Sequence, residues 1–337
     1  MESNMRIENI FNSSSSAPPT LSTNQSRCEL PLEMAFTMFV LNIVVGFFGT
    51  WGNILVCVSV MITPSLQRIS NYFICSLAVA DLSINLIDQP LLVVMLWGRS
   101  KSLCFPQVEL AFRIVGNVSC AVSLVTLCFI SIDRCVSITK PFNYQSIITP
   151  TKFYIMLVAS WVLPGVYTYI RIDVSKKITS YVTVGLFGSS YILLAVCYLL
   201  IFIQIKKQGR ERCNLAAYRE GPSQASQALE RRLAVTIAMI IAVFTVAWIP
   251  IFYLRVTAPK KNYGVLYDWA RTIALSSSAV NPALYCLRND EYRKAFAKIL
   301  RFIFCCSKRK SAQIENHNRA PTRRTESTRF TPNENAK

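Results

Sequence analysis

The chain has 337 residues, of which 52% are hydrophobic and 16% charged, and its formal net charge is +18. A soluble protein with so few charged residues could not cover its surface with polar groups, so much of the surface is expected to face lipid. The basic residues gather between and after the apolar runs, which is typical of membrane topology and argues against nucleic-acid binding. The cysteines form no CxxC pair, and the single histidine, His317, lies in a polar tail, so neither a zinc site nor an enzyme is indicated.

Seven apolar runs are long enough to cross a bilayer as helices, since a crossing needs about 20 mostly apolar residues. They are too long for the strands of a barrel, so the predicted fold is all-α, a seven-transmembrane helix bundle. The fourth run is the shortest and the seventh is the most polar. In chain order the runs are Met34–Ile62, Asn71–Trp97, Leu110–Ile138, Phe153–Ile170, Ile178–Ile205, Leu233–Val256 and Val265–Leu287.

The orientation of the runs follows from the basic residues in their connections. Lysine and arginine are about twice as frequent on the side that holds Arg68, Lys206–Arg232 and Arg288–Lys310, and the richer side is expected to be cytoplasmic. The N-terminus is then outside the plasma membrane and the C-terminus inside. Asn12 and Asn24 begin Asn-x-Ser triplets in the outer tail and are predicted glycosylation sites.

Ionisable residues within the runs are spaced so that they share one side of a helix. Charged groups in a bilayer are costly unless they face the bundle interior or one another. Asp81 and Asp88 lie seven residues apart, close to two helical turns, and therefore share a face. Similar stripes occur in the third and sixth runs, formed by Glu109, Arg113, Ser123 and Arg134 and by Glu230, Trp248 and Arg255.

Short motifs occur in a fixed order along these runs. They are Gly52-Asn53, Leu77-Ala78-Val79-Ala80-Asp81 with Pro90, Asp133-Arg134-Cys135 with Pro141, Trp161 with Pro164, Phe244 with Ala247-Trp248-Ile249-Pro250, and Asn281-Pro282-Ala283-Leu284-Tyr285. On these residues the chain resembles the rhodopsin-like (class A) G-protein-coupled receptors, over about Pro31 to Cys306. Each motif alone is unspecific, and the resemblance depends on all of them lying on the expected span.

The resemblance implies a receptor that binds an extracellular ligand and activates a heterotrimeric G protein, with arrestin and a receptor kinase as further partners. A charge pair between Arg134 and Glu230 would hold the third and sixth helices together at rest. Alternatively, Glu230 complements its basic neighbours in solvent. The residues to which the resemblance assigns the activation switch are Asp133, Arg134, Tyr198, Glu230, Trp248, Pro250, Asn281, Pro282 and Tyr285.

The resemblance also implies a site for a sodium ion as allosteric ligand, and no cofactor is required. The corresponding residues are Asp81, Ser123, Ser277 and Asn281. Carboxylate and hydroxyl oxygens suit a small hard cation. Ser277 replaces a residue that is often asparagine, and a water-filled polar network without an ion is the alternative.

The region after the seventh run reads as a short amphipathic helix on the inner membrane surface, with Cys305 and Cys306 as palmitoylation sites. The chain is thus divided into an extracellular tail (1–30), a seven-transmembrane domain (31–289), this amphipathic helix (290–306) and a disordered cytoplasmic tail (307–337).

Two departures from the family pattern concern the outer end. Glu109 stands where the family usually has a disulfide-forming cysteine, and Cys28 and Cys104 are the outer cysteines left to pair; free thiols or another pairing are the alternatives. Ser190 replaces the usual proline of the fifth helix. With the short second outer loop, this resembles the branch of melanocortin, cannabinoid, lysophospholipid and adenosine receptors.

The ligand is expected to be neither an amine nor retinal. The resemblance would place the amine-binding aspartate at Gly116 and the retinal-binding lysine at Leu275. Arginines in the outer third favour a lipid acid, a peptide or another anion. The alternative is that Asp88 pairs with Arg113 or Arg271 and Glu109 with another arginine, which would leave little free charge. A transporter or channel and a non-coupling scaffold are the alternative functions. The predicted ligand-binding residues are Asp88, Glu109, Arg113, Gly116, Trp248, Arg255, Asp268 and Arg271.

Overall fold

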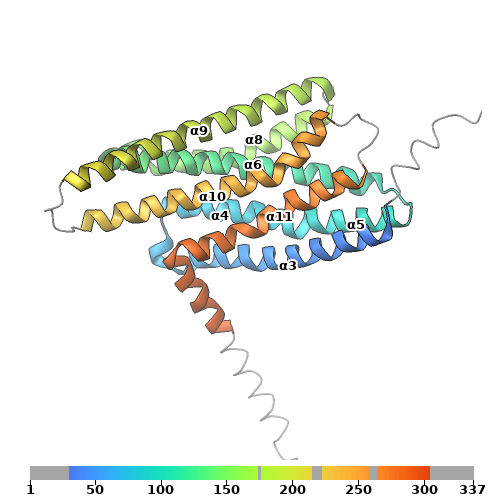
Figure 1. The fold of residues 1–337 in the computed structure, drawn as a ribbon, viewed down its shortest axis with the longest axis horizontal. Helices are drawn as coiled ribbons and strands as arrows, with labels where there is room; N and C mark the ends of the chain where they lie inside the picture. Colours follow the sequence, from blue (N-terminus) through green and yellow to red (C-terminus); the bar gives the residue numbers. More distant parts are fainter. Residues whose placement is uncertain (1–29, 174–175, 215–221, 258–263, 304–337) are drawn as a thin grey trace, which may run out of the picture. The chain divides into compact units, whose positions relative to one another are not determined.

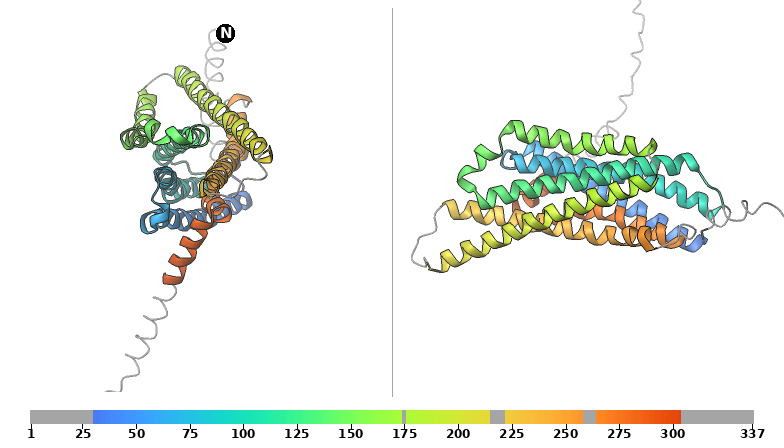
Figure 2. Two further views of the ribbon diagram at one scale, coloured as in Figure 1. Left: turned by 90° about the vertical axis from the view of Figure 1, so that its left-hand side faces the viewer. Right: turned by 90° about the horizontal axis from the view of Figure 1, so that it is seen from above.

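The computed structural model describes residues 30–173, 176–214, 222–257 and 264–303, without the side chains of 172–180, 209, 211–230 and 255–257. This part of the chain contains no strand. It forms long helices that run alongside one another (Figures 1 and 2). The helices are α3 (Leu32–Ile62), α4 (Ile69–Ser83) continued by α5 (Gln89–Ser100), α6 (Pro106–Thr139), α8 (Pro150–Asp173), α9 (Lys176–Asn214), α10 (Pro222–Thr257) and α11 (Val265–Arg288).

Each predicted run lies within one of these helices, with α4 and α5 forming the second span, so the prediction of an all-α seven-helix bundle is confirmed. Several helices are longer than the apolar runs because polar turns extend them beyond the hydrocarbon core. The cytoplasmic end of α9, for example, reaches Asn214.

Six of the helices are long and apolar enough to cross a membrane by composition alone, and α11 is not among them. Helix α11 is less apolar because it contains several polar residues, which a membrane helix can hold when they are buried against protein. Asp268, Thr272, Ser278 and Asn281 of α11 are all buried. This helix packs against α10 and α3, so much of its surface faces protein rather than lipid.

The second span contains a wide turn that the sequence analysis did not predict. Residues Ile84–Asp88 form one π-helical turn between α4 and α5, in which the Gln89 N–H donates to the Ile84 carbonyl. Pro90 follows directly, and a proline lacks an N–H and clashes with the carbonyl four residues earlier. A π turn accommodates this defect. Asp88 and Gln89, at the end of the turn, are both buried.

The bundle interior has two main apolar clusters. The larger includes Leu77, Leu127, Ile240 and Tyr285, and a smaller cluster packs around Leu92. Large apolar side chains are also exposed around the bundle, among them Phe36, Phe47, Phe48, Val158, Leu163, Ile192, Val246 and Ile249. In water such a surface would be unfavourable, whereas in a membrane it faces lipid tails.

The chain divides into two compact units, residues 1–296 and 297–337. A further helix covers residues 290–303. Within the first unit it presents Tyr292 and Phe296 to the interior, while Arg293 and Lys294 are exposed. The Tyr292 ring stacks on Tyr285 of α11, with 5.5 Å between ring centroids.

Candidate functional site

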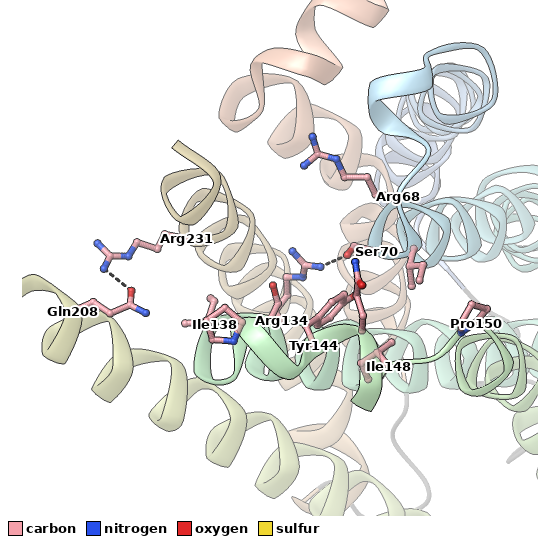
Figure 3. A pocket seen from close by; sticks show the side chains of 13 residues that line it. Arg68, Ser70, Arg134, Ile138, Tyr144, Ile148, Pro150, Gln208 and Arg231 are labelled. Atoms are coloured by element: carbon pink, nitrogen blue, oxygen red, sulfur yellow. Dashed lines mark hydrogen bonds between the residues drawn. The ribbon is translucent and has the colours of Figure 1, made fainter. Parts of the chain in front are cut away.

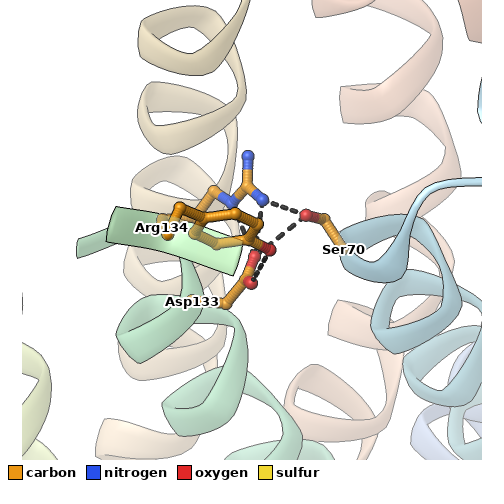
Figure 4. Close-up of polar contacts among 4 residues, drawn as sticks. Ser70, Asp133 and Arg134 are labelled. Atoms are coloured by element: carbon orange, nitrogen blue, oxygen red, sulfur yellow. Dashed lines mark hydrogen bonds and ion pairs between the residues drawn. The ribbon is translucent and has the colours of Figure 1, made fainter. Parts of the chain in front are cut away.

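At the end of the bundle that is predicted to be cytoplasmic, Arg134 of α6 is buried in a polar cluster (Figure 4). Its Nε and Nη2 donate to Asp133 Oδ2 at 3.0 and 2.5 Å, and Nη2 also donates to Ser70 Oγ on α4. Ser70 donates to the same carboxylate oxygen at 2.9 Å. The hydroxyl of Tyr144, on α7 (Tyr144–Ile147), donates to Asp133 Oδ1 at 2.6 Å. Two charges that would be costly alone are therefore paired and hydrogen-bonded.

Sequence reasoning predicted Asp133 and Arg134 in this cluster but not Ser70 or Tyr144. The pKa of the Tyr144 hydroxyl is raised, first by burial and then by the charge of Asp133. The phenol therefore stays protonated at physiological pH and acts as a donor. A tyrosine in a loop after a predicted helix gives no sequence signal of this contact.

A cavity of about 590 Å³ opens beside the arginine cluster. Figure 3 shows Arg134, Tyr144 and Arg68 around it, together with Gln208 of α9 and Arg231 of α10. Arg231 Nη2 donates to Gln208 Oε1 at 2.7 Å, joining α10 to α9. The cavity is thus lined by several basic side chains, which come from α6 and from helices that pack around it.

The predicted switch residues of the sixth and fifth helices make contacts at different levels of α10. The Trp248 ring stacks on Phe244, with 5.6 Å between centroids, and lies one half-turn before Pro250. Tyr198 of α9 donates through its hydroxyl to the Ala234 carbonyl at 3.4 Å. The side chain of Glu230 lies outside the described residues, so its pairing with Arg134 stays a prediction.

In α11, Pro282 packs against Gly52 of α3 so closely that a Cβ at residue 52 would lie 2.8 Å from the proline Cβ. Only glycine leaves space for this contact without displacement. Tyr285 follows within one turn and is buried. The close packing of Pro282 thus accounts for the glycine at position 52.

The predicted sodium-site residues are partly brought together. Asn281 Nδ2 donates to Asp81 Oδ2 at 2.7 Å, joining α11 to α4. Ser123 is buried, and its hydroxyl has no hydrogen-bond partner among the described residues. Ser277 instead donates to the Ala274 carbonyl of its own helix at 2.7 Å. A carboxylate and an unengaged hydroxyl fit an oxygen-liganded cation, with Ser277 turned toward its own backbone.

Further amide bridges next to this pair were not predicted. Asn53 donates to the Ser278 carbonyl at 3.2 Å, and Ser278 donates to Asn85 Oδ1 at 3.0 Å. Nearer the outer end, Asn42 donates to Thr272 at 3.1 Å. Asparagines inside apolar runs were the available signal, because an amide in lipid needs a partner.

At the outer end, Asp268 of α11 forms an ion pair with Arg99 of α5 and lies 3.6 Å from Arg271. The Arg271 guanidinium also lies over the rings of Tyr267 and Phe112, 4.3 and 5.2 Å from their centroids. Arg99 was not predicted to take part, because it follows the apolar run in sequence. Arg271 is therefore held by a carboxylate and two aromatic rings.

The remaining predicted outer residues lie on α6 and the second span. Arg113 pairs with Glu109 of the same helix, and both side chains are largely exposed. Asp88 is buried beside Gly116, and its oxygens have no hydrogen-bond partner among the described side chains and backbone. The structure thus does not pair Asp88 with Arg113 or Arg271, which the sequence analysis left open.

Some predictions fall outside the described residues. These are the glycosylation sites Asn12 and Asn24, the palmitoylation sites Cys305 and Cys306, Cys28, and the side chain of Arg255. Cys104 is disulfide-bonded. None of the other cysteines with described side chains forms a disulfide, so its partner lies outside this part of the chain and the pairing with Cys28 stays a prediction.

Seven long helices, a buried arginine cluster at one end and inward-facing polar residues together define a seven-helix membrane receptor. The family model of 7 transmembrane receptors (rhodopsin family) matches residues 52–172 and 167–285. The chain therefore belongs to this family. It is a multi-pass membrane protein and a receptor rather than an enzyme, as predicted.

Named relatives agree with this assignment. The histamine H2 receptor of Cavia porcellus is 26% identical over 80% of this chain and 80% of its own length. The alpha-1A adrenergic receptor of Rattus norvegicus is 25% identical, over 81% of this chain and 70% of its own. Squid rhodopsin shares the fold with a TM-score of 0.70 at 19% identity, over 82% of this chain and 88% of its own. None of these similarities tests the branch suggested by Ser190.

Proposed function

We propose that the protein is a plasma-membrane receptor, with its N-terminus outside, that promotes nucleotide exchange on a heterotrimeric G protein when an extracellular ligand binds. The observation that carries the proposal is the buried cluster of Ser70, Asp133, Arg134 and Tyr144 beside the cytoplasmic cavity. The cluster keeps the Arg134 guanidinium folded back on its own helix. Release of this guanidinium would give the cavity a cation for a G-protein segment.

The coupling between the two ends would pass through α10 and α11. Pro250 and Pro282 interrupt the backbone hydrogen bonds of these helices and make them natural pivots. Trp248 and the Asp81–Asn281 contact lie between the outer residues and the arginine cluster. A ligand shifts the resting and active populations only by its difference in affinity for the two states.

A sodium ion held by Asp81 and Ser123 would favour the resting state if the site binds sodium more tightly in that state. This would be the case if activation separates Asn281 from Asp81 and thereby changes the site. The expected result is a lower basal nucleotide exchange in sodium than in potassium, and an Asp81→Asn variant should not show this difference. Arrestin and a receptor kinase are proposed as further partners that act on the cytoplasmic tail.

The class of ligand is less constrained by the outer arginines than the sequence suggested. Each described arginine of the predicted pocket already has a carboxylate, because Arg113 pairs with Glu109 and Arg271 with Asp268. An anionic ligand would have to displace these carboxylates. Asp88, by contrast, is a buried outer carboxyl group whose oxygens have no hydrogen-bond partner among the described residues.

The function is tested by GDP release from a panel of purified G proteins mixed with the full-length receptor in lipid nanodiscs. Wild-type receptor should accelerate release from at least one G protein above the rate without receptor. Arg134→Ala should abolish the acceleration while leaving the thermal unfolding midpoint within a few degrees of wild type. Acceleration that persists in Arg134→Ala, or that is absent with every G protein, would favour a scaffold, transporter or channel instead.

A further inference from the structure

Asp88 carries a carboxylate that the fold buries without neutralising it. Its side chain ends the π turn of the second span and is 0% exposed. Neither carboxylate oxygen has a hydrogen-bond partner among the described residues. A buried carboxyl group in this condition is unfavourable as a charge, so it either holds a proton or is ionised by a cationic partner that comes from elsewhere.

The opposite wall is Gly116 of α6. A Cβ at this position would lie 3.2 Å from Asp88 Oδ2, which is tighter than an ordinary carbon–oxygen contact. Its distance to Asp88 Cγ would be 3.6 Å, which is ordinary. Glycine therefore allows the backbone of α6 to approach Asp88 closely and leaves this side of the carboxyl group uncovered by a side chain. No other described glycine has a carboxylate in front of its missing Cβ.

The part of α6 that lies next to Asp88 is exposed toward the outer end of the bundle. Gly116 is partly exposed, and Arg113, about one turn nearer the outer end of α6, has a side chain that is 60% exposed. A residue three positions earlier lies above its successor on nearly the same helix face. A ligand that binds at Arg113 and Gly116 would therefore lie next to Asp88.

The arginines of the predicted pocket whose side chains are described, together with Arg99, are engaged with other acids. Arg113 is paired with Glu109, and Asp268 is paired with both Arg99 and Arg271. Arg271 is further held between two aromatic rings. If Arg113 or Arg271 moved to Asp88, Glu109 or Asp268 would lose a neutralising partner. Asp88 therefore gains no ion-pair partner from these two arginines.

We infer that Asp88 is the acceptor for an ammonium group of the extracellular ligand, and that Gly116 matters because it leaves the neighbouring side of the carboxyl group without a covering side chain. This inference rests on the proposed function, because it identifies the ligand class of the same receptor. A charged N–H group would satisfy both the charge and the hydrogen-bonding capacity of the buried carboxylate. The anionic ligand expected from the outer arginines becomes the competing outcome.

The experiment uses purified full-length receptor in nanodiscs and measures the thermal unfolding midpoint. The probes are 2-phenylethylamine and tryptamine, each compared with its uncharged alcohol, 2-phenylethanol or tryptophol, and a fatty acid, decanoate, is the anionic probe. The variants are Asp88→Asn and the double variant Asp88→Asn with Gly116→Asp, which moves the carboxylate across the gap. Asp290→Asn, which removes a half-exposed carboxylate at the other end of the bundle, is the matched control.

At least one amine should raise the midpoint of wild type and Asp290→Asn by about 2–4 °C, while its alcohol should not. Asp88→Asn should lose the shift, and the double variant should regain at least half of it. Because each shift is taken relative to the same variant without probe, altered folding does not imitate loss of binding.

Equal shifts by amine and alcohol, an amine shift that survives in Asp88→Asn, or a shift by decanoate alone would overturn the inference. So would the absence of a shift with every amine. GDP release is measured in parallel without probes. Nucleotide exchange without an amine shift would contradict the ammonium site but support the receptor function. An amine shift without nucleotide exchange would support the ammonium site but contradict the receptor function.

Discussion

Polar side chains within the bundle are tied to neighbouring helices, as the low polarity of a membrane requires. Trp161 of α8 donates through Nε1 to Ser76 Oγ of α4 at 2.9 Å. Such bonds are individually modest, because the unfolded chain in a membrane also finds partners for its polar groups. Their joint effect is to fix which helix faces which.

The Trp161–Ser76 bond can be measured by a double-mutant cycle with Trp161→Phe and Ser76→Ala. We expect a coupling of about 0.6 kcal/mol, and not more than about 2 kcal/mol, in the free energy of unfolding. Ser276→Ala is the control partner, since this hydroxyl bonds within α11 and should give a coupling near zero with Trp161→Phe. Full additivity of Trp161→Phe and Ser76→Ala would contradict the observed bond.

Tyr144→Phe tests the cytoplasmic cluster at a single atom. The variant removes the donor to Asp133 and should raise basal nucleotide exchange several-fold, because a hydrogen bond to a charged group contributes about 1.5–3 kcal/mol and part of it is lost in the active state. Tyr154→Phe, at an exposed tyrosine of α8, is the matched control and should not change the rate. An unchanged or lower rate in Tyr144→Phe would mean that this bond does not hold the resting state.

At this scale the sequence predicted the motif residues better than their partners. The Asp133–Arg134 pair and the Asp81–Asn281 contact connect residues that were both named. Ser70, Tyr144 and Arg99 were missed because their roles depend on how loops and helix ends fold back onto the bundle. Gly116 was interpreted as the absence of a carboxylate, whereas the structure places the carboxylate of Asp88 beside it.

Individual helices follow their apolar patterns, and the exceptions have a physical cause. The π turn at Ile84–Asp88 was not predicted, because periodicity reports a helix but not a single wide turn within it. Pro90 was the available signal. The polarity of α11 was recognised from the sequence, and the structure accounts for it through burial between α3 and α10.

The ion pair of Arg99 with Asp268 joins α5 to α11 and is nearly buried, with side-chain exposures of 12% and 2%. Arg99→Gln should lower the free energy of unfolding by about 1–3 kcal/mol, less than for a fully orphaned buried charge, because Arg271 still neutralises Asp268. The matched control is Arg113→Gln, whose exposed pair within α6 should contribute less than about 1 kcal/mol. Equal effects of the two substitutions in thermal unfolding would contradict a structural role of the α5–α11 pair.

For the whole molecule, composition and span count predicted the fold class because lipid permits few alternatives. Family membership followed from motifs that occur in order along the chain. The ligand could not be predicted in the same way, since ligand class depends on which charges remain unpaired after folding. The structure reduces that question to the environment of one carboxylate, Asp88.

Helix α11 crosses the membrane in a seven-helix bundle, although its composition alone does not identify it as a membrane span. An odd number of crossings puts the two termini on opposite faces, and six crossings would put them on the same face. The direct measurement is antibody labelling of epitope tags at both termini in intact and permeabilised cells. The N-terminal tag should be labelled in intact cells and the C-terminal tag only after permeabilisation. Labelling of both tags on the same face would show that α11 does not cross the membrane.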